Sequence, residues 1–354
     1  MAFGFGDACP FLFLRLFFCG GDSMTAPAMY PSNNSLIKVN EHLSMRFNLF
    51  DLHDSAEDIN VRRLIRVYSV VPKYSQFKSG PWAGQAIRVT SFLRKVNEKL
   101  KKEIGSGWKR EWLNNIGYKF ALKSIGDWFI GRASVPLIAL KKLEVFGLDC
   151  EVSVLLNNCN YFSCTTRAPY KLPHFLTPDL AYLTGAILGD GHIRRTEDKI
   201  SFEVSEKWLS NKFIEKVVAV FEQKLRESIR IGRGKDKYLA RFDNKSAKRL
   251  FTKIIGIPSG KKSHIITVPE LIKASSKECQ TAFLEGVFDT DGGSRGKNRL
   301  GLTSASKQFR DGIIDLLEVQ GINAFKDEWV NKMYNRSYYG LRLSKGVKPS
   351  FMQE

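Results

Sequence analysis

Hydrophobic and polar residues alternate strictly in several short segments of the second half of the chain. Ile200, Phe202 and Val204 are apolar, and the residues between them are polar. This period of two is typical of a strand in a sheet with one buried and one exposed face. It recurs where Tyr238, Ala240 and Phe242 alternate with Lys235, Lys237 and Arg241, and where Tyr339, Leu341 and Leu343 alternate with Arg336, Tyr338 and Arg342. We therefore expect sheets whose exposed faces are basic.

Helical periodicity surrounds these strands. Amphipathic segments at about 208–225 and 307–320 are expected to cover the apolar faces of the sheets. Upstream, the pattern predicts a helix over about 85–104 and an all-helical stretch over 107–150. Three prolines between 164 and 178 indicate a linker at 165–177.

The segment after this linker is an internal repeat. LTGAILGDG at 183–191 matches LEGVFDTDG at 284–292, and the two copies are 101 residues apart. The same shift places Lys235, Lys237 and Arg241 on Arg336, Tyr338 and Arg342. Repeat 1 is expected at about 178–256 and repeat 2 at about 275–345.

A helix is predicted to carry each copy of the motif. Thr177 is the expected N-cap of the first helix, with Pro178 in its first turn. Ser275, with Glu278 three residues later, is the expected cap of the second. Both helices are expected to end at Asp-Gly, where the glycine can adopt the left-handed conformation.

The paired motifs resemble those of the single-chain, two-motif LAGLIDADG homing endonucleases. The resemblance covers about half of the chain, roughly residues 177–345. It implies an α/β (α+β) fold with two pseudo-symmetric αββαββα repeats, which form a saddle-shaped pair of antiparallel sheets. It also implies a freestanding, site-specific endonuclease that makes a double-strand break at a long asymmetric DNA target. The chain ends in Met352-Gln353-Glu354 rather than a splicing His-Asn, so we expect a freestanding protein rather than an intein.

The motif residues suit metal-dependent phosphodiester hydrolysis. Small residues at Gly185, Gly189, Gly286 and Thr290 would let two helix backbones pack closely. Such packing brings Asp190 and Asp291 together at two negative helix ends, where a divalent cation would relieve their repulsion. We expect Mg²⁺, with Mn²⁺ as a substitute, held by these two carboxylates, water and phosphate. Asp289 has no acidic counterpart in the first copy, so we interpret it as an interface or capping residue.

Other site residues follow from the resemblance. Lys262, with Lys261 as second choice, lies in a stretch like the lysine-bearing segment that precedes the second motif of intein-type members. The alternative is a solvated lysine pair. Arg336 can likewise be a catalytic basic residue or a plain phosphate contact. The predicted DNA-binding residues are Lys235, Lys237, Arg241, Arg336, Tyr338, Arg342, Arg194, Arg195 and Arg295.

Composition agrees with a nucleic-acid partner. The net charge of +19 favours a polyanion, and both halves of the chain are basic. Double-stranded DNA is the expected partner, intron RNA is a further candidate, and a membrane is not expected. Cys150, Cys159, Cys164 and His174 could close a zinc site, although ordinary reduced thiols are the favoured interpretation.

The N-terminal part carries weaker signals. Residues 1–23 are set aside because Met24 is an alternative start, and residues 24–106 have no assigned role. Residues 107–164 contain a stretch, from Ser124 to Leu143, that resembles the later helices of a helix-turn-helix domain. The alternative is a small helical packing module.

The expected protein is an intracellular monomer with an internal pseudo-dimer, in the cytoplasm or nucleoid, with an organelle as the alternative. The competing interpretation is an RNA maturase or a DNA-binding regulator on the same scaffold. Retention of both Asp190 and Asp291 favours the endonuclease.

Overall fold

The structure is a computed structural model. It describes residues 46–52, 64–67, 82–117, 120–164, 169–231, 236–294, 299–333 and 335–345. The segment 1–23 with its alternative start, and the site candidates Lys235 and Arg295, lie outside these residues.

The N-terminal region combines helices with a small antiparallel sheet of strand order β2-β1-β3-β4. Its elements are η3 (Leu49–Leu52), β1 (Arg66–Val67), α2 (Ala83–Glu103), α3 (Trp108–Ile116), α4 (Leu122–Phe129), β2 (Val135–Pro136), α5 (Leu137–Lys141), η6 (Lys142–Phe146), α6 (Asp149–Asn157), β3 (Tyr161–Ser163) and β4 (Tyr170–Lys171). The expectation that 107–150 is all-helical was wrong at Val135–Pro136, which pairs with β1.

The segment predicted as a linker contributes to this region. Within 165–177, strand β4 pairs with β3, and the side chains of Tyr170, Leu172 and Leu176 are buried. Phe47 N also donates to His174 O at 2.7 Å. The chain from 169 to 177 is therefore packed into the fold.

The helix-turn-helix resemblance does not extend to an exposed recognition helix. α5, which follows the turn, spans only Leu137–Lys141, and its first four residues are buried. Trp108, Trp112 and Trp128 of the preceding helices form a buried aromatic cluster. These features favour the alternative of a helical packing module.

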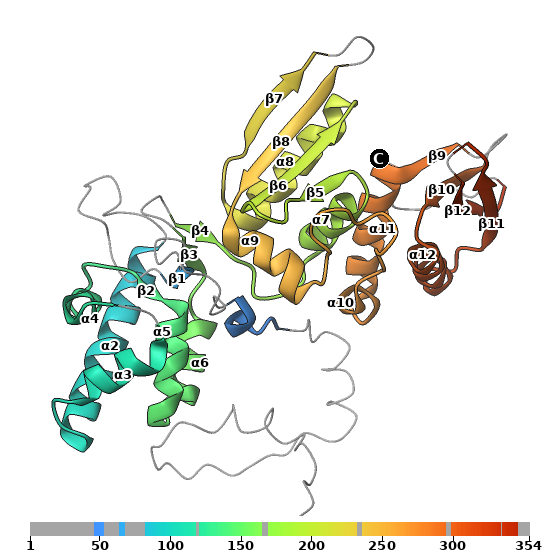
Figure 1. Cartoon of the computed structure of the whole chain (residues 1–354). Helices are drawn as coiled ribbons and strands as arrows, with labels where there is room; N and C mark the ends of the chain where they lie inside the picture. The colour runs from blue at the N-terminus through green and yellow to red at the C-terminus, as the bar shows by residue number, and fades with distance from the viewer. Residues whose placement is uncertain are drawn as a thin grey trace, which may run out of the picture.

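The C-terminal half contains two repeats of the same topology. Repeat 1 comprises α7 (Pro178–Leu188), β5 (Gly191–Ile193), β6 (Lys199–Val204), α8 (Lys207–Phe221), β7 (Arg226–Arg230), β8 (Lys237–Asp243), α9 (Lys245–Arg249) and the π-helical turn η7 (Leu250–Ile254). Repeat 2 comprises α10 (Glu270–Lys273), α11 (Lys277–Asp291), β9 (Gly292–Ser294), β10 (Leu300–Ser304), α12 (Lys307–Val319), β11 (Ala324–Asn331) and β12 (Arg336–Leu343). The sheets have the equivalent strand orders β5-β6-β8-β7 and β9-β10-β12-β11. Figure 1 shows them on either side of the central pair α7 and α11. The predicted α+β class and its two-repeat organisation are confirmed.

The predicted period of two is confirmed in the sheets. Ile200, Phe202 and Val204 are buried beneath α8, where the rings of Phe202 and Phe213 stack at 4.2 Å. Leu341 and Leu343 are buried on the corresponding face of the second sheet. The opposite face of each sheet is therefore the one left to meet a partner.

Candidate nuclease site and nucleic-acid interface

The helices that carry the two motifs begin at side-chain caps. Thr177 accepts from Leu180 N, as predicted. The second cap is Ser276, which accepts from Cys279 N, so the prediction of Ser275 was wrong by one residue. Neither glycine of the two Asp-Gly pairs is left-handed, because Gly191 is not among the residues with positive φ and φ is −73° at Gly292. The first helix also ends at Leu188, before its Asp-Gly pair. Gly292 instead begins strand β9, so each motif leads straight into its sheet.

The two motif helices pack with their backbones in near contact. A β-carbon on Gly185 would lie 2.2 Å from Phe283 O, and one on Gly286 would lie 2.2 Å from Tyr182 O. These reciprocal contacts express the pseudo-symmetry of the repeats. Further along, a β-carbon on Gly189 would lie 2.1 Å from Thr290 Oγ1. The predicted interface residues are therefore brought together, and three of the four require minimal side chains.

This packing brings the carboxylates of Asp190 and Asp291 to one place. Asp291 Cγ lies 3.4 Å from the position of a β-carbon on Gly189, next to Asp190. Desolvation raises the pKa of both carboxyls, and it raises that of Asp291 to about 6 with help from the charge of Asp190. Burial of both carboxyls, together with the effect of the Asp190 charge on Asp291, disfavours their ionised forms, and a bound cation would relieve this cost. Among the described residues no cluster of three or more His, Cys, Asp or Glu forms a metal site.

Lys262 lies at the same end of α7. Its Nζ donates to the backbone carbonyls of Ile187, Leu188 and Gly189, and the bond to Gly189 O is 2.7 Å long. It thereby occupies carbonyls that an α-helix leaves unpaired at its C-terminus. Burial lowers the pKa of Lys262 to about 8, although Asp291 and Asp190 act in the opposite direction. Lys261 is exposed, so the structure places only Lys262 at the acidic pair.

The interface role predicted for Asp289 agrees with its contacts. Tyr182 on α7 donates its hydroxyl to Asp289 Oδ2 at 2.9 Å. Lys212 on α8 forms ion pairs with both Asp289 and Glu285. Asp289 therefore joins the two motif helices rather than facing Asp190.

The exposed face of the first sheet is basic, with an acidic residue among the cations. Lys237 and Arg241 on β8 are exposed, and Lys237 Nζ lies 3.6 Å from Glu203 Oε1. Arg226 and Arg230 on β7, which were not predicted as DNA-binding residues, pair with Arg241 and Lys237. Arg226, Ser228 and Arg230 are spaced by two and share one face of the strand, and this spacing is the signal that could have identified the arginines.

Arg194 and Arg195, just after β5, are both exposed. Arg194 forms an ion pair with Glu197. Gly260, in the loop that carries Lys262, donates its N–H to Ile193 O at 2.8 Å. The arginines and the Lys262 loop therefore lie beside each other.

The second sheet differs from the first. Arg336 is exposed, whereas Arg342 forms a two-point ion pair with Asp327 of β11, at 2.6 and 2.7 Å. Tyr338 stacks on Trp329. The ion pair with Asp327 partly neutralises the predicted basic face of the second sheet. The rest of that face carries the aromatic rings of Trp329 and Tyr338.

The predicted alternative of a zinc site has no support in the described residues. Cys164 Sγ contacts the hydroxyls of Tyr170 and Ser246, and His174 Nε2 contacts Cys159 O at 3.0 Å. Burial raises the pKa of Cys159 to about 12. These groups are packed as neutral side chains.

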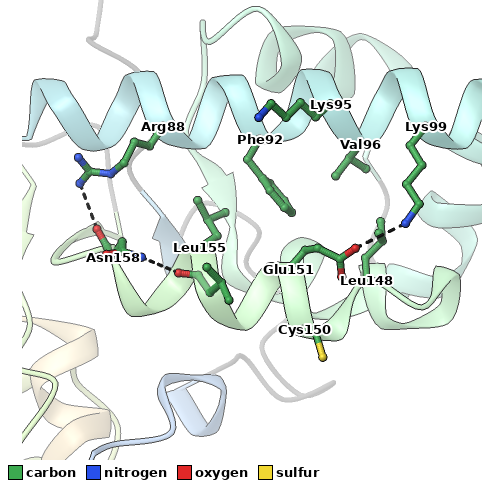
Figure 2. A pocket seen from close by; sticks show the side chains of 11 residues that line it. Arg88, Phe92, Lys95, Val96, Lys99, Leu148, Cys150, Glu151, Leu155 and Asn158 are labelled. Carbon is green, nitrogen blue, oxygen red and sulfur yellow. Dashed lines mark hydrogen bonds and ion pairs between the residues drawn. The ribbon is translucent and has the colours of Figure 1, made fainter. Parts of the chain in front are cut away.

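A cavity of about 520 Å³ lies between α2 and α6 of the N-terminal region (Figure 2). Phe92, Val96 and Leu155 line its apolar part. At its rim Arg88 donates to the backbone carbonyl of Asn158, the C-cap of α6, and Lys99 forms an ion pair with Glu151 of α6. This groove contains no residue of the nuclease site.

The fold and the site define a two-repeat protein with an acidic pair where two closely packed helices end. Residues 278–351, in the second repeat, match the model of the LAGLIDADG-like domain.

Curated relatives match about half of the chain. A replication factor C small subunit of Methanocaldococcus jannaschii is 33% identical over 167 residues, which are 47% of this chain and 9% of that protein. A probable translation initiation factor IF-2 of the same organism is 30% identical over 189 residues, which are 50% of this chain and 15% of that protein. The chain therefore spans only a small part of the relatives that it matches.

The solved structures to which the chain is similar include homing endonucleases. A variant of I-DmoI is 18% identical with a TM-score of 0.36, covering 47% of this chain and 88% of that one. I-WcaI, bound to its DNA recognition sequence, is 17% identical with a TM-score of 0.33, covering 47% of this chain and 76% of that one. I-DmoI has also been solved in complex with DNA and Mn.

None of the helices within the described ranges combines the length and the apolar character needed to cross a bilayer.

Proposed function

We propose that this chain is a site-specific, metal-dependent endonuclease that cuts both strands of double-stranded DNA. The observation that carries the proposal is the convergence of Asp190 and Asp291 at the adjoining ends of α7 and α11, enforced by the reciprocal contacts of Gly185 and Gly286. A protein that only bound DNA would gain nothing from desolvated carboxylates facing a phosphate backbone.

The donor set fits a hard divalent cation such as Mg²⁺ or Mn²⁺. Mg²⁺ uses one or two carboxylates and completes its shell with water and phosphate oxygens, and Asp190 and Asp291 supply the two carboxylates. When bound, the cation would activate a water molecule and stabilise the leaving 3′ oxygen. Lys262 holds the last turn of α7, and with it Asp190, in position.

The sheets provide the surface for DNA. The proposed contacts from the first sheet and its β5 end are Lys237, Arg241, Arg194 and Arg195, to which the structure adds Arg226 and Arg230. Arg336, Tyr338 and Arg342 are the proposed contacts of the second sheet. Because the faces differ in chemistry, the target is expected to be asymmetric. The internal pair of repeats suits a monomer.

Cleavage of a plasmid that carries the two DNA sequences flanking the gene of this protein, joined directly to each other, tests this function. The protein should linearise it with Mg²⁺, and EDTA should stop cutting while binding remains. Asp190→Asn and Asp291→Asn should each abolish double-strand cleavage and keep target affinity, because Asn preserves shape but not charge. Specific binding without nicking in Mg²⁺ or Mn²⁺ would instead indicate a maturase or a regulator. Near-normal cutting by either variant would overturn the metal site.

A further inference from the structure

The two sheets carry different side chains at the same cross-strand position. In the first sheet Arg230 of β7 pairs with Lys237 of β8. In the second, Trp329 of β11 pairs with Tyr338 of β12. Lys237 and Tyr338 are 101 residues apart, which is the offset of the repeat. A pair of cations in one repeat is thus replaced by a pair of aromatic rings in the other.

The backbone beneath the rings accommodates this replacement. The planes of Trp329 and Tyr338 are 19° apart, with centroids at 6.2 Å. A β-carbon on Gly340 would lie 2.9 Å from Trp329 Cζ3, so the indole lies across Gly340. The equivalent of Gly340 in the first sheet is Leu239, whose side chain is buried. Trp329 is 39% exposed, and Phe325, one pair beyond Gly340, is 57% exposed.

Cations and aromatic rings bind different parts of a nucleic acid. Lysine and arginine contact phosphates, whereas aromatic side chains on a sheet stack with bases. In a closed duplex the faces of the bases are already covered by their neighbours, so a ring can stack only with a base that is unpaired. Arg336, one pair further along β12, is exposed and can contact the adjoining phosphate.

We propose that Trp329 and Tyr338 form a stacking platform for unpaired bases, which makes single-stranded nucleic acid a further ligand of this chain. The inference rests on the proposed role of the sheets as nucleic-acid surfaces, but not on cleavage. RNA and single-stranded DNA share the chemistry, and separate arms of the test distinguish them.

The test uses the full chain with single-stranded RNA or DNA of about 12 nucleotides, each carrying a central 2-aminopurine. Binding to the wild-type protein should quench 2-aminopurine emission. Trp329→Ala should lose the quench and weaken single-strand binding about tenfold, with duplex affinity and the salt slope unchanged. Trp329→Phe should restore most of both, because a flat apolar ring suffices for stacking.

Two further variants are matched controls. Arg230→Ala, at the equivalent place in the first sheet, should lower the salt slope and leave the quench intact. Gly340→Ala keeps the indole but displaces it, so it should reduce the quench. Undiminished single-strand affinity in Trp329→Ala, or an equal loss on duplex and single strands, would overturn the platform. If the wild-type protein quenches 2-aminopurine emission but does not cleave the plasmid, only the proposed nuclease function is refuted. If it cleaves the plasmid normally but does not quench the emission, only the stacking platform is refuted.

Discussion

At the scale of single residues, Lys262 and Lys261 are neighbours with different surroundings. Lys262 donates to three carbonyls at the end of α7, while Lys261 is exposed. Lys262→Ala should therefore slow cleavage by at least about tenfold and raise the Mg²⁺ concentration for half-maximal cutting, because the turn that carries Asp190 loses its anchor. Lys261→Ala should change neither quantity. Cleavage rates across a Mg²⁺ titration measure both effects, and equal behaviour of the two variants would remove Lys262 from the site.

Arg342 shows what sequence periodicity omits. Its position on the exposed face followed from the alternation along β12, but its ion pair with Asp327 depends on the register between β11 and β12. The residues between β11 and β12 do not indicate this register from the sequence alone. The pairing of Arg342 with Asp327, which neutralises part of the exposed face of the second sheet, was therefore not predictable. For the same reason the pairing of Trp329 on β11 with Tyr338 on the neighbouring strand β12 was not predicted.

The pair with Asp327 leads to a prediction about binding. Asp327→Asn removes a negative charge from the proposed interface and releases Arg342 for a phosphate. Target affinity should rise at low salt, and the slope of log affinity against log salt should steepen by about one unit. Arg241→Ala, which removes a cation from the first face, should do the reverse. Anisotropy titrations at several salt concentrations provide the measurement. An unchanged slope in both variants would mean that neither face meets DNA.

At the scale of elements, the close approach of α7 and α11 is the feature that the sequence predicted best. Small residues four apart, repeated at one offset, predict the close contacts of Gly185 and Gly286. Helix ends were predicted less well, because Ser275 and Ser276 are equally good caps and only tertiary packing chooses between them. The N-terminal sheet was not predictable, since strands such as Arg66–Val67 are too short to show a period.

Substitution of the interface glycine tests this element directly. Gly185→Ala would place a β-carbon 2.2 Å from the backbone at Phe283 O, which no rotamer change can relieve. We expect the free energy of unfolding to fall by more than about 2 kcal/mol. Gly126→Ala in α4 meets nothing within 4 Å, so it should be neutral or stabilise by about 0.5–1 kcal/mol through helix propensity. Urea unfolding of both variants gives the comparison, and a Gly185→Ala protein as stable as the wild type would contradict the close packing.

At the scale of the whole molecule, the N-terminal region and repeat 1 share buried contacts. Arg249 of α9 donates to Leu52 O at 3.0 Å, and the hydroxyl of Tyr170 lies 2.7 Å from Ser246 Oγ. The same continuous core contains Leu49 and Phe162 of the N-terminal region and Leu250 of repeat 1. Composition and prolines indicated a boundary at 165–177, but they carry no information on contacts between residues some 200 positions apart.

Truncation decides whether that boundary separates two independent domains. A chain of residues 166–354 loses β3, the partner of β4, and uncovers the surface of repeat 1 that Leu52 contacts. It should unfold at a clearly lower temperature than a chain of residues 46–354, because it exposes apolar area that is otherwise buried. The longer fragment keeps β3 and Leu52. Calorimetric scans of the three proteins measure this, and their cleavage of the same plasmid shows whether any loss of activity follows the loss of stability. Equal transition temperatures for both fragments would establish that residues 166–354 fold independently, and the proposed division at 165–177 would then stand.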